Sequence, residues 1–400
     1  MSVDAFDAEA GTINVVAPEF TLRPHATMLE MVERCPVARI QYTDWPVLSR
    51  YEDVAWALRH PEIFSSDLGE LLALGNVRPM IPQQIDPPLQ TRYRKILDSQ
   101  FTKKAVNRIE PALREHARNL IAAVLDAGEC EFDSAFAIPL PCKAFLEFMG
   151  LPVEEMDHFL ALKNGVIRPD AHPADLARCT ELRAETGRQI YAYFEDLIDQ
   201  RTRAPREDLM TYLVQVELEG RRLSREEILD ICYLFLLGGL DTVTATLGCN
   251  IAYLAENAEQ RRRISQDSGC VEAVVEELLR WQTPVTLLPR VLKQPVDLRG
   301  VHMAAGQVVN LMISAADLDA AEFPRAGEVD FDRDRNRHLA FGLGPHRCLG
   351  SHLARLEVRV GLEEWHRLIP DYAIKPGEIP RVSPGIREFQ YLPLVWPGVA

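Results

Sequence analysis

The segment FGLGPHRCLG, residues 341–350, combines residue types that can do chemistry. It holds one cysteine, Cys348, two residues after His346, and three glycines shape the chain around them. Four kinds of site could use such a loop: a dinucleotide-binding loop, a zinc site, a Cys–His nucleophile or a thiolate ligand to haem iron.

Two of these four sites fit the residues poorly. A dinucleotide loop of the pattern GxGxxG would need a third glycine where this chain has Arg347, and no strand–helix–strand unit surrounds the segment. A zinc site could use His346, Cys348 and His352, but a fourth ligand at a sensible spacing is lacking.

The shape of the segment favours the thiolate ligand. Gly342 and Gly344 let the backbone approach a flat ligand closely. Cys348 comes just before a helix predicted over 351–368, whose N-terminal N–H groups would stabilise a thiolate. That helix carries two adjacent apolar stripes, so we expect it to be buried over a broad face. The stripes are Leu353, Leu356 and Val360, and Ala354, Val358 and Trp365.

The longest predicted helix begins at Ser224 and runs to about Asn257. Its start carries a capping box, because Glu227 follows Ser224 by three residues. Its length of about 30 residues corresponds to ~45 Å, enough to cross the whole domain.

The middle of this helix, LFLLGGLDTVTA over 234–245, is unusual. Gly238 and Gly239 each cost roughly 1 kcal/mol relative to alanine in a helix interior. Thr242 can donate to the carbonyl of Gly238 and so locally open the helix. The residues alone leave two readings open: a packing glycine pair beside a solvated Asp241 and Thr242, or a functional bulge.

The rest of the chain predicts one large, mainly helical domain with small β-sheets. Helical spacing of apolar residues recurs over 51–60, 91–101, 109–128, 184–201 and 270–282, and strand-like segments lie at 46–50, 288–303 and 307–314. We expect a single domain over 1–400, with residues 1–20 loosely ordered.

Composition excludes several classes of protein. The net charge of −15 argues against a general nucleic-acid binder or a polybasic membrane binder. The chain has no signal pattern and no run approaching ~18 apolar residues, so we expect a soluble, cytoplasmic monomer. None of the eight cysteines forms a CxxC pair, and Cys232 and Cys249 should be core residues.

Together these motifs resemble the cytochrome P450 haem-thiolate monooxygenases along nearly the whole chain. The cysteine loop matches the family pattern F-G-x-G-x-[H/R]-x-C-x-G at every specified position. EELLR supplies the family's E-x-x-R pair, Glu277 and Arg280, and GGLDT over 238–242 matches its oxygen-binding groove. IDPPLQ (85–90), CLGSHLAR (348–355) and LPLVW (392–396) extend the resemblance to the soluble bacterial camphor-hydroxylase group.

The resemblance implies the cytochrome P450 fold, haem b as cofactor and a role for each matching residue. Cys348 would be the proximal iron ligand, and Thr242 and Asp241 would serve oxygen activation and proton delivery. Nine further residues would contact the haem. Among them, Gln90 stands where many relatives have histidine, so its contact is open. Besides Cys348 they are Arg94, Arg290, His346, Gln90, Phe341, Gly342, Gly350, Gly238 and Gly239.

The resemblance also implies that Glu277 and Arg280 pair with an arginine of the FDRDR stretch. Arg333 is our first choice and Arg335 the second. Without the family pattern, Glu277 and Arg280 would read as an i,i+3 surface pair worth ~0.2–0.5 kcal/mol.

Electrons would come from NAD(P)H through a ferredoxin reductase and a [2Fe–2S] ferredoxin, by the same resemblance. Arginines near the cysteine loop could form a basic docking patch: Arg92, Arg94, Arg347, Arg355 and Arg359. The alternatives are a peroxide-driven hydroxylase of the same fold, which usually lacks the acid–alcohol pair found here, and a haem sensor or carrier.

The substrate is the least determined property. Family analogy places the pocket walls at 66–85, 155–195, 234–242, 283–290 and 384–389, with Leu234, Leu237, Thr286, Leu287 and Ile386 as candidates. They suggest a medium-sized apolar substrate: a terpenoid, a norisoprenoid or an aromatic compound. Residues 66–85 contain no aromatic residue, and we expect Arg78 to point outward, so camphor should bind worse than longer, less polar compounds such as ionones.

Overall fold

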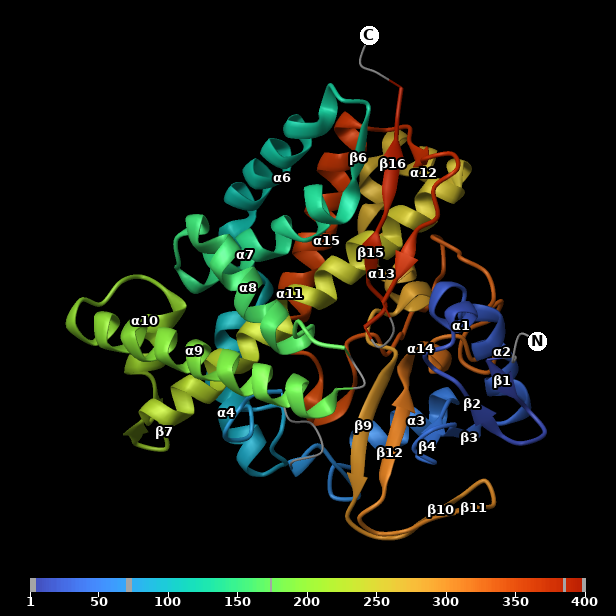
Figure 1. Ribbon diagram of the computed structural model, residues 1–400, viewed down its shortest axis with the longest axis horizontal. Helices are drawn as coiled ribbons and strands as arrows, with labels where there is room; N and C mark the ends of the chain where they lie inside the picture. The colour runs from blue at the N-terminus through green and yellow to red at the C-terminus, as the bar shows by residue number, and fades with distance from the viewer. Residues whose placement is uncertain (1–4, 70–73, 173–174, 384–385, 398–400) are drawn as a thin grey trace.

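The computed structural model describes residues 5–69, 74–172, 175–383 and 386–397. Helices make up most of the molecule, and a mixed sheet with its covering helices occupies one side of it (Figure 1). This arrangement is the helix-rich domain with small sheets that the sequence predicts.

Helix α11, Arg225–Glu256, passes through the middle of the molecule between α7 (Pro139–Met149) and α15 (Ser351–Leu368) (Figure 1). The predicted start is confirmed, because the Ser224 hydroxyl accepts from the N–H of Glu227 and the Glu227 carboxylate accepts from Ser224. Within the described residues α11 alone is long and apolar enough to cross a membrane, but 78% of its most apolar window is buried inside the protein. It is the core helix of the fold.

Helix α15 packs on α6 (Glu110–Leu125), α11 and α13 (Val271–Gln282). Its bounds match the predicted 351–368, and Leu356, Val358 and Trp365 are buried as the two apolar stripes require. The beginning of α15 therefore holds the end of the cysteine loop against the helical core.

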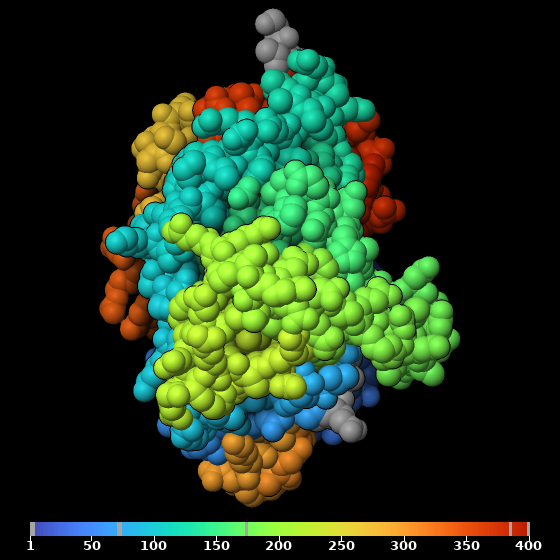
Figure 2. Space-filling model, turned by 90° about the vertical axis from the view of Figure 1, so that its left-hand side faces the viewer, coloured from blue at the N-terminus to red at the C-terminus, as the bar shows by residue number. Residues whose placement is uncertain are grey.

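The other helices surround this centre, and Figure 2 shows α9 and α10 covering one face of the molecule. Those of seven residues or more are α2 (His25–Arg34), α3 (Tyr51–Arg59), α4 (Leu89–Leu97), α8 (Met156–Ile167), α9 (Leu176–Arg203), α10 (Leu209–Gln215) and α12 (Ala258–Gln266); shorter ones are α1 (Pro18–Leu22), α5 (Lys103–Val106) and α14 (Ile313–Ala316).

The largest sheet has the strand order β1-β2-β3-β4-β12-β9-β5. Its strands are β1 (Phe6–Asp7), β2 (Thr12–Ile13), β3 (Val37–Ile40), β4 (Pro46–Leu48), β12 (Val308–Met312), β9 (Leu287–Leu292) and β5 (Phe64–Ser65). Antiparallel pairing of β9 with β12 sets Arg290 opposite Val309.

Small sheets and hairpins complete the fold. They pair β10 (Val296–Leu298) with β11 (Val301–Met303), β7 (Glu217–Leu218) with β8 (Arg221–Arg222), β14 (Arg381–Val382) with β15 (Phe389–Tyr391), and β16 (Pro393–Val395) with both β13 (Ala373–Ile374) and β6 (Glu129–Glu131).

The expectation of a loosely ordered N-terminus is wrong for residues 5–20; residues 1–4 lie outside the described part. Strand β2 pairs with β3, and Phe6, Ile13 and Phe20 are buried. Burial of these apolar side chains against the sheet compensates for the lost chain entropy.

Candidate functional site

The loop from Phe341 to Gly350 lies directly before α15. The N–H of Cys348 donates to the carbonyl of Phe341 at 2.7 Å and closes the loop on itself. Gly344 has a φ of +72°, and a Cβ there would lie 2.3 Å from the carbonyl oxygen of Leu58. The turn therefore requires glycine at this position for both conformational and steric reasons.

The Cys348 side chain is enclosed by protein and yet accessible. Its surroundings raise the pKa of the thiol through burial, while the N–H of Gly350 and the charges of Arg94 and Arg347 act in the opposite direction. The residue nevertheless remains exposed. The thiol is therefore open to a ligand, and a cation that bound the thiolate would lower its pKa.

Helix α4 holds the loop from one side. The Gln90 amide donates to the carbonyl of Pro345 at 2.6 Å, and the Arg94 guanidinium donates to the carbonyl of Arg347 at 2.6 Å. Arg94 also pairs with Asp98 at 2.9 Å. Both predicted residues thus contact the loop directly, through carbonyls on either side of His346.

Arg290 is a buried cation without an ion pair among the described residues. Its one hydrogen bond to them goes to the neighbouring carbonyl of Pro289, and burial lowers the pKa of its guanidinium to about 10. The nearby Asp86 carboxylate is held by Lys293 at 2.7 Å and by Ser65. A buried charge is costly unless paired, so Arg290 is suited to an anionic ligand.

His346 completes the group of potential anion-binding residues. Its Nε2 is buried and has no hydrogen-bond partner within the described chain, because Asp86 Oδ1 lies 3.8 Å away. Burial lowers the pKa of His346, while the Asp86 carboxylate acts in the opposite direction. A neutral imidazole can donate one N–H.

The glycine pair of α11 leaves an open patch on an otherwise buried helix. A Cβ on Gly238 would meet no atom closer than 4.0 Å, and Gly238 is exposed although the helix around it is buried. The Thr242 hydroxyl donates to the carbonyl of Gly238 at 3.2 Å, as predicted, and α11 stays helical through this stretch. Protein packing does not explain the glycine at 238; a ligand lying against it would.

Asp241 belongs to a buried network of charges. Its side chain is fully buried, with Lys163 Nζ 2.6 Å from Oδ1 and Arg168 Nη1 3.4 Å from Oδ2. Arg168 also pairs with Glu388. Burial raises the pKa of Glu388. The acid next to Thr242 is therefore paired and is not solvated.

Lys163, Arg168 and Glu388 were not predicted from the sequence as partners of this network. One signal existed: Lys163 lies four residues after Phe159 and three before Val166, so it occupies the apolar stripe of α8. A lysine in such a position needs a buried partner.

Glu277 and Arg280 form a fully buried ion pair at 2.7 Å. Arg333 Nε lies 3.0 Å from the Glu277 carboxylate, whereas Arg335 is exposed and forms no ion pair with a described residue. Arg333, the first choice, therefore makes the contact.

The five candidate substrate residues differ in burial. Leu237 and Thr286 are buried, Leu234 and Leu287 are half-buried, and Ile386 bridges to Val285. The proposed pocket walls also include 70–73, 173–174 and 384–385, which lie outside the described residues.

Arg78 does not simply point outward. Its Nε donates to Asp230 of α11 at 2.9 Å, its guanidinium lies 5.4 Å from the ring centre of Tyr191, and 37% of its side chain is exposed. Pairing with the buried Asp230 removes the cost of a lone charge, a possibility that the sequence could not reveal.

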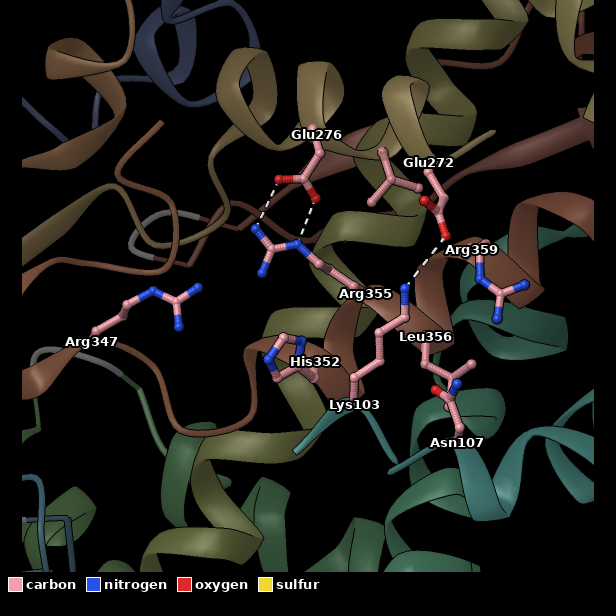
Figure 3. Close-up of a pocket in the computed structure, with 10 residues that line it drawn as sticks. Lys103, Asn107, Glu272, Glu276, Arg347, His352, Arg355, Leu356 and Arg359 are labelled. Carbon is pink, nitrogen blue, oxygen red and sulfur yellow. Dashed lines mark hydrogen bonds and ion pairs between the residues drawn. The ribbon is translucent and has the colours of Figure 1, made fainter. Parts of the chain in front are cut away.

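A hollow of about 370 Å³ lies on the surface between α5, α13 and α15 (Figure 3). Of the arginines expected to form a basic patch here, Arg355 pairs with Glu276 and Arg359 with Glu110 and Glu363. Arg92 pairs with Glu219, whereas Arg347 has no ion pair within the described chain. The patch therefore carries less free positive charge than the sequence suggested.

The residues present fit a haem. These residues offer an exposed thiol, an open helix face at Gly238, a buried cation without an ion pair in the described chain, and a histidine Nε2 without a hydrogen bond there. Gly350 adds a second open position, because a Cβ there would meet nothing within 4 Å. An iron ligand, a flat surface and anion-binding groups are what an iron porphyrin with two propionates requires.

Known proteins resemble this chain over most of its length. The family model described as cytochrome P450 matches residues 159–365. A probable cytochrome P450 127A1 of Sinorhizobium fredii is 33% identical over 84% of this chain and 79% of its own. A methyl-branched lipid omega-hydroxylase of Mycobacterium tuberculosis is 33% identical over 87% and 83%, and a vitamin D(3) 25-hydroxylase of Pseudonocardia autotrophica is 32% identical over 90% and 89%.

The fold has equally close solved counterparts. The structure of cytochrome P450 CYP109Q5 from Chondromyces apiculatus aligns with a TM-score of 0.88 at 28% identity, covering 98% of this chain and 100% of that one. With the matching cysteine loop and relatives named as hydroxylases, these similarities identify the family. The chain belongs to the cytochrome P450 family of haem-containing monooxygenases.

Proposed function

We propose that this protein hydroxylates an apolar substrate, using O₂ and electrons from a [2Fe–2S] ferredoxin that an NAD(P)H-dependent reductase reduces. The main support is the exposed Cys348 thiol at the end of its glycine-shaped loop, together with the open position at Gly238 on the buried helix α11. We assign Cys348 as the protein ligand to the haem iron. When bound, haem supplies the activation of O₂ and the insertion of oxygen into a C–H bond.

Three residues would hold the haem propionates. Arg290 and His346 have free donors in the described chain, and Arg94 keeps donors beyond its bonds to Asp98 and the loop. Gln90 already donates to Pro345, so its predicted propionate contact has the weakest support. The remaining contacts would be made by Phe341, Gly342, Gly350, Gly238 and Gly239.

Thr242 and Asp241 would deliver protons at the α11 wall. The Thr242 hydroxyl can both donate and accept, and it lies one residue from a carboxylate held by Lys163 and Arg168. A proton reaching Asp241 could pass to the Thr242 oxygen through a water after the carboxylate turns away from Lys163. This acid–alcohol pair favours use of O₂ over use of peroxide.

The ferredoxin would dock near the surface hollow. Arg347 forms no ion pair with a described residue, and Lys103 lies 4.0 Å from Glu272 in an exposed pair that an incoming carboxylate could compete with. Screening should therefore weaken the association at higher salt.

The substrate class rests on pocket character and on relatives. Leu234, Leu237 and Leu287 give the proposed pocket apolar walls, and named relatives act on a methyl-branched lipid and on vitamin D(3). We propose a medium-sized or elongated apolar substrate such as a terpenoid or norisoprenoid, in a cytoplasmic enzyme. Arg78 is engaged by Asp230, so a ketone such as camphor should gain little from it.

One reconstitution tests these assignments together. The ferrous–CO spectrum of the wild type should be of the thiolate type and should be lost in Cys348→Ala. With surrogate ferredoxin and reductase, Thr242→Ala should still consume NAD(P)H but release more peroxide per product formed. Turnover with peroxide alone, equal to the reconstituted rate, would favour the peroxide-driven alternative; no turnover with any electron source would favour a sensor or carrier.

Substrate choice needs a separate measurement. Spin-state titrations with camphor, ionones and longer lipids should give the tightest binding for the longer, less polar compounds. Camphor binding tighter than every other compound would contradict the proposed substrate class.

A further inference from the structure

Arg355 of α15 lines the surface hollow, but its guanidinium is bound by Glu276 of α13. Its Nε lies 2.5 Å from Glu276 Oε1 and its Nη2 lies 2.8 Å from Glu276 Oε2, an arrangement visible in Figure 3. The centre of its guanidinium lies 4.3 Å from the centre of the Phe341 ring. A bidentate ion pair and a stacked aromatic ring use most of the binding capacity of an arginine.

Glu276 connects this arginine to His338. His338 Nε2 lies 3.1 Å from Glu276 Oε2, and only 3% of the histidine side chain is exposed. His338 Nδ1 accepts the N–H of Ala340 at 3.2 Å. Because Nδ1 is the acceptor, Nε2 must carry a proton and donate it to Glu276. The carboxylate is thus held on two sides, and Arg355 and His338 lower the pKa of Glu276 to about 2.

These contacts meet at the start of the cysteine loop. Ala340 is held through its N–H by His338, and Phe341 is held through its ring by Arg355. The carbonyl of Phe341 then accepts the N–H of Cys348 at 2.7 Å. A continuous set of contacts therefore runs from Glu276 of α13 to the backbone of the cysteine.

We propose that Arg355, Glu276 and His338 are positioning residues that fix Phe341 and, through it, the Cys348 thiolate. The proposal rests on the assignment of Cys348 as the iron ligand and is independent of the ferredoxin. It gives Arg355 a different role from the docking role expected from its charge. Without Arg355, Phe341 loses its stacked guanidinium and keeps only the contact with the His338 ring and the core packing, so the carbonyl that orients the Cys348 N–H is held less firmly.

The test compares Arg355→Met with Arg359→Met in the haem-containing protein. Arg359 is a matched control, because it lies one turn further along α15, borders the same hollow and pairs with Glu110 and Glu363. The first readout is the rate at which the ferrous–CO complex loses its thiolate-type spectrum. We expect Arg355→Met to raise this rate about ten-fold, the factor for losing one charge-assisted pair, and Arg359→Met to leave it unchanged.

The haem reduction potential is the second readout. Removing the Arg355 charge leaves Glu276 less neutralised, so the potential of Arg355→Met should become more negative. In the double variant Arg355→Met/Glu276→Gln the potential should return toward the wild type, while the fast spectral loss remains, because the charges cancel but Phe341 still lacks the stacked guanidinium. A purely structural role would lower the melting temperature and leave the potential unchanged.

Several outcomes would overturn the proposal. They are a wild-type spectral lifetime in Arg355→Met, an equal effect of Arg359→Met, or full recovery of the lifetime in the double variant. If Arg355→Met does not retain haem, Arg355→Lys keeps the charge but loses the planar stack, and it should show the same change at smaller size; wild-type behaviour would again overturn the proposal. Loss of the thiolate spectrum in Cys348→Ala separates failure of the ligand assignment from failure of this proposal.

Discussion

Arg280 and Arg290 are ten residues apart and both buried, but their surroundings are opposite. Arg280 uses all five of its N–H groups: three go to the carbonyls of Asp317, Ala326 and Glu328, and two to the Glu277 carboxylate. Arg290 donates to a single neighbouring carbonyl in the described chain. Burying a charged group costs several kcal/mol unless hydrogen bonds or an opposite charge compensate for it. Among the described residues, Arg280 has this compensation and Arg290 does not.

This difference separates a structural charge from a ligand-binding one. The Glu277 cluster joins α13 to the segment before the cysteine loop, since its carboxylate also accepts from the N–H of Asp330 and from Arg333. Arg290 lies on β9 with its remaining guanidinium donors unpaired among the described residues, and the propionates of a bound haem would provide the missing anion. An unpaired buried cation thus marks a ligand site better than the presence of arginine alone.

The largest effect on stability should follow from removing the Glu277 charge, which pairs with Arg280 and Arg333. Glu277→Gln would leave two buried guanidiniums, Arg280 and Arg333, without a compensating charge. We expect a loss of about 3–5 kcal/mol in the free energy of unfolding, enough to prevent haem-containing protein from accumulating. Thermal or urea unfolding measures it. Arg335→Met, on the exposed neighbour, should change stability by less than ~0.5 kcal/mol.

Substitution of Arg290, which has no ion pair among the described residues, should have the opposite effect on stability. Arg290→Met removes an uncompensated buried charge, so the haem-free protein should be at least as stable as the wild type. Haem binding should lose one charge-assisted bond of ~1.5–3 kcal/mol, which is roughly a ten- to hundred-fold faster haem release. Transfer of haem to an acceptor globin measures this rate. Arg299→Met, whose charge is paired with Asp53, is the control and should release haem at the wild-type rate.

Two buried carboxylates differ in the same way, one with hydrogen-bond partners and one without. Asp317 is held by the N–H of Leu339 and the hydroxyl of Thr283, whereas both oxygens of Asp133 are buried without a partner in the described chain. Burial, with smaller contributions from Glu131 and Glu388, raises the pKa of Asp133 to about 9. In the unfolded chain an aspartate titrates near ~3.9.

The pH dependence of stability follows from this shift. Between about pH 4 and 9 the folded state keeps a proton on Asp133 that the unfolded state has lost, so raising the pH through this window favours unfolding. Asp133→Asn should remove this contribution and stabilise the protein by about 1–3 kcal/mol at pH 8, with little effect at pH 4. Melting curves at both pH values test it. An equal gain at both, or the same gain in the exposed Asp126→Asn, would contradict the titration.

Local patterns explain what the sequence could predict. The capping box at Ser224, the bond from Thr242 to Gly238 and the bounds of α15 depend on residues within four positions of each other. The cysteine loop and Arg333 could be assigned because a family pattern covers them.

Long-range pairing explains what the sequence could not predict. Asp241, Lys163 and Glu388 come from three separate segments, and nothing in the spacing of residues shows that they meet. The same holds for Arg355, whose charge suggested an exposed patch but is used by Glu276. The sequence shows which side chains are charged. Only the fold shows whether another group already compensates that charge.

The smallest effect should come from Gln90, the neutral residue among the proposed haem contacts. Its side chain is buried, its amide donates to the carbonyl of Pro345 at 2.6 Å, and its oxygen accepts from Thr91. Gln90→Met keeps the length of the side chain and removes one neutral hydrogen bond, worth ~0.5–1.5 kcal/mol. Haem release should therefore accelerate only about two- to ten-fold.

Arg94 is the charged counterpart of Gln90, since it contacts the same loop one turn further along α4. Its bond to the carbonyl of Arg347 carries a charge, and the same guanidinium is assigned to a propionate. Arg94→Met should therefore accelerate haem release more than Gln90→Met, and added salt should reduce the difference because it screens the partly exposed charge. If Gln90→Met released haem as fast as Arg94→Met at every salt concentration, the contact with the loop would matter more than the charge. The distinction between polar groups satisfied by the protein and charged groups that need a ligand would then not hold at this site.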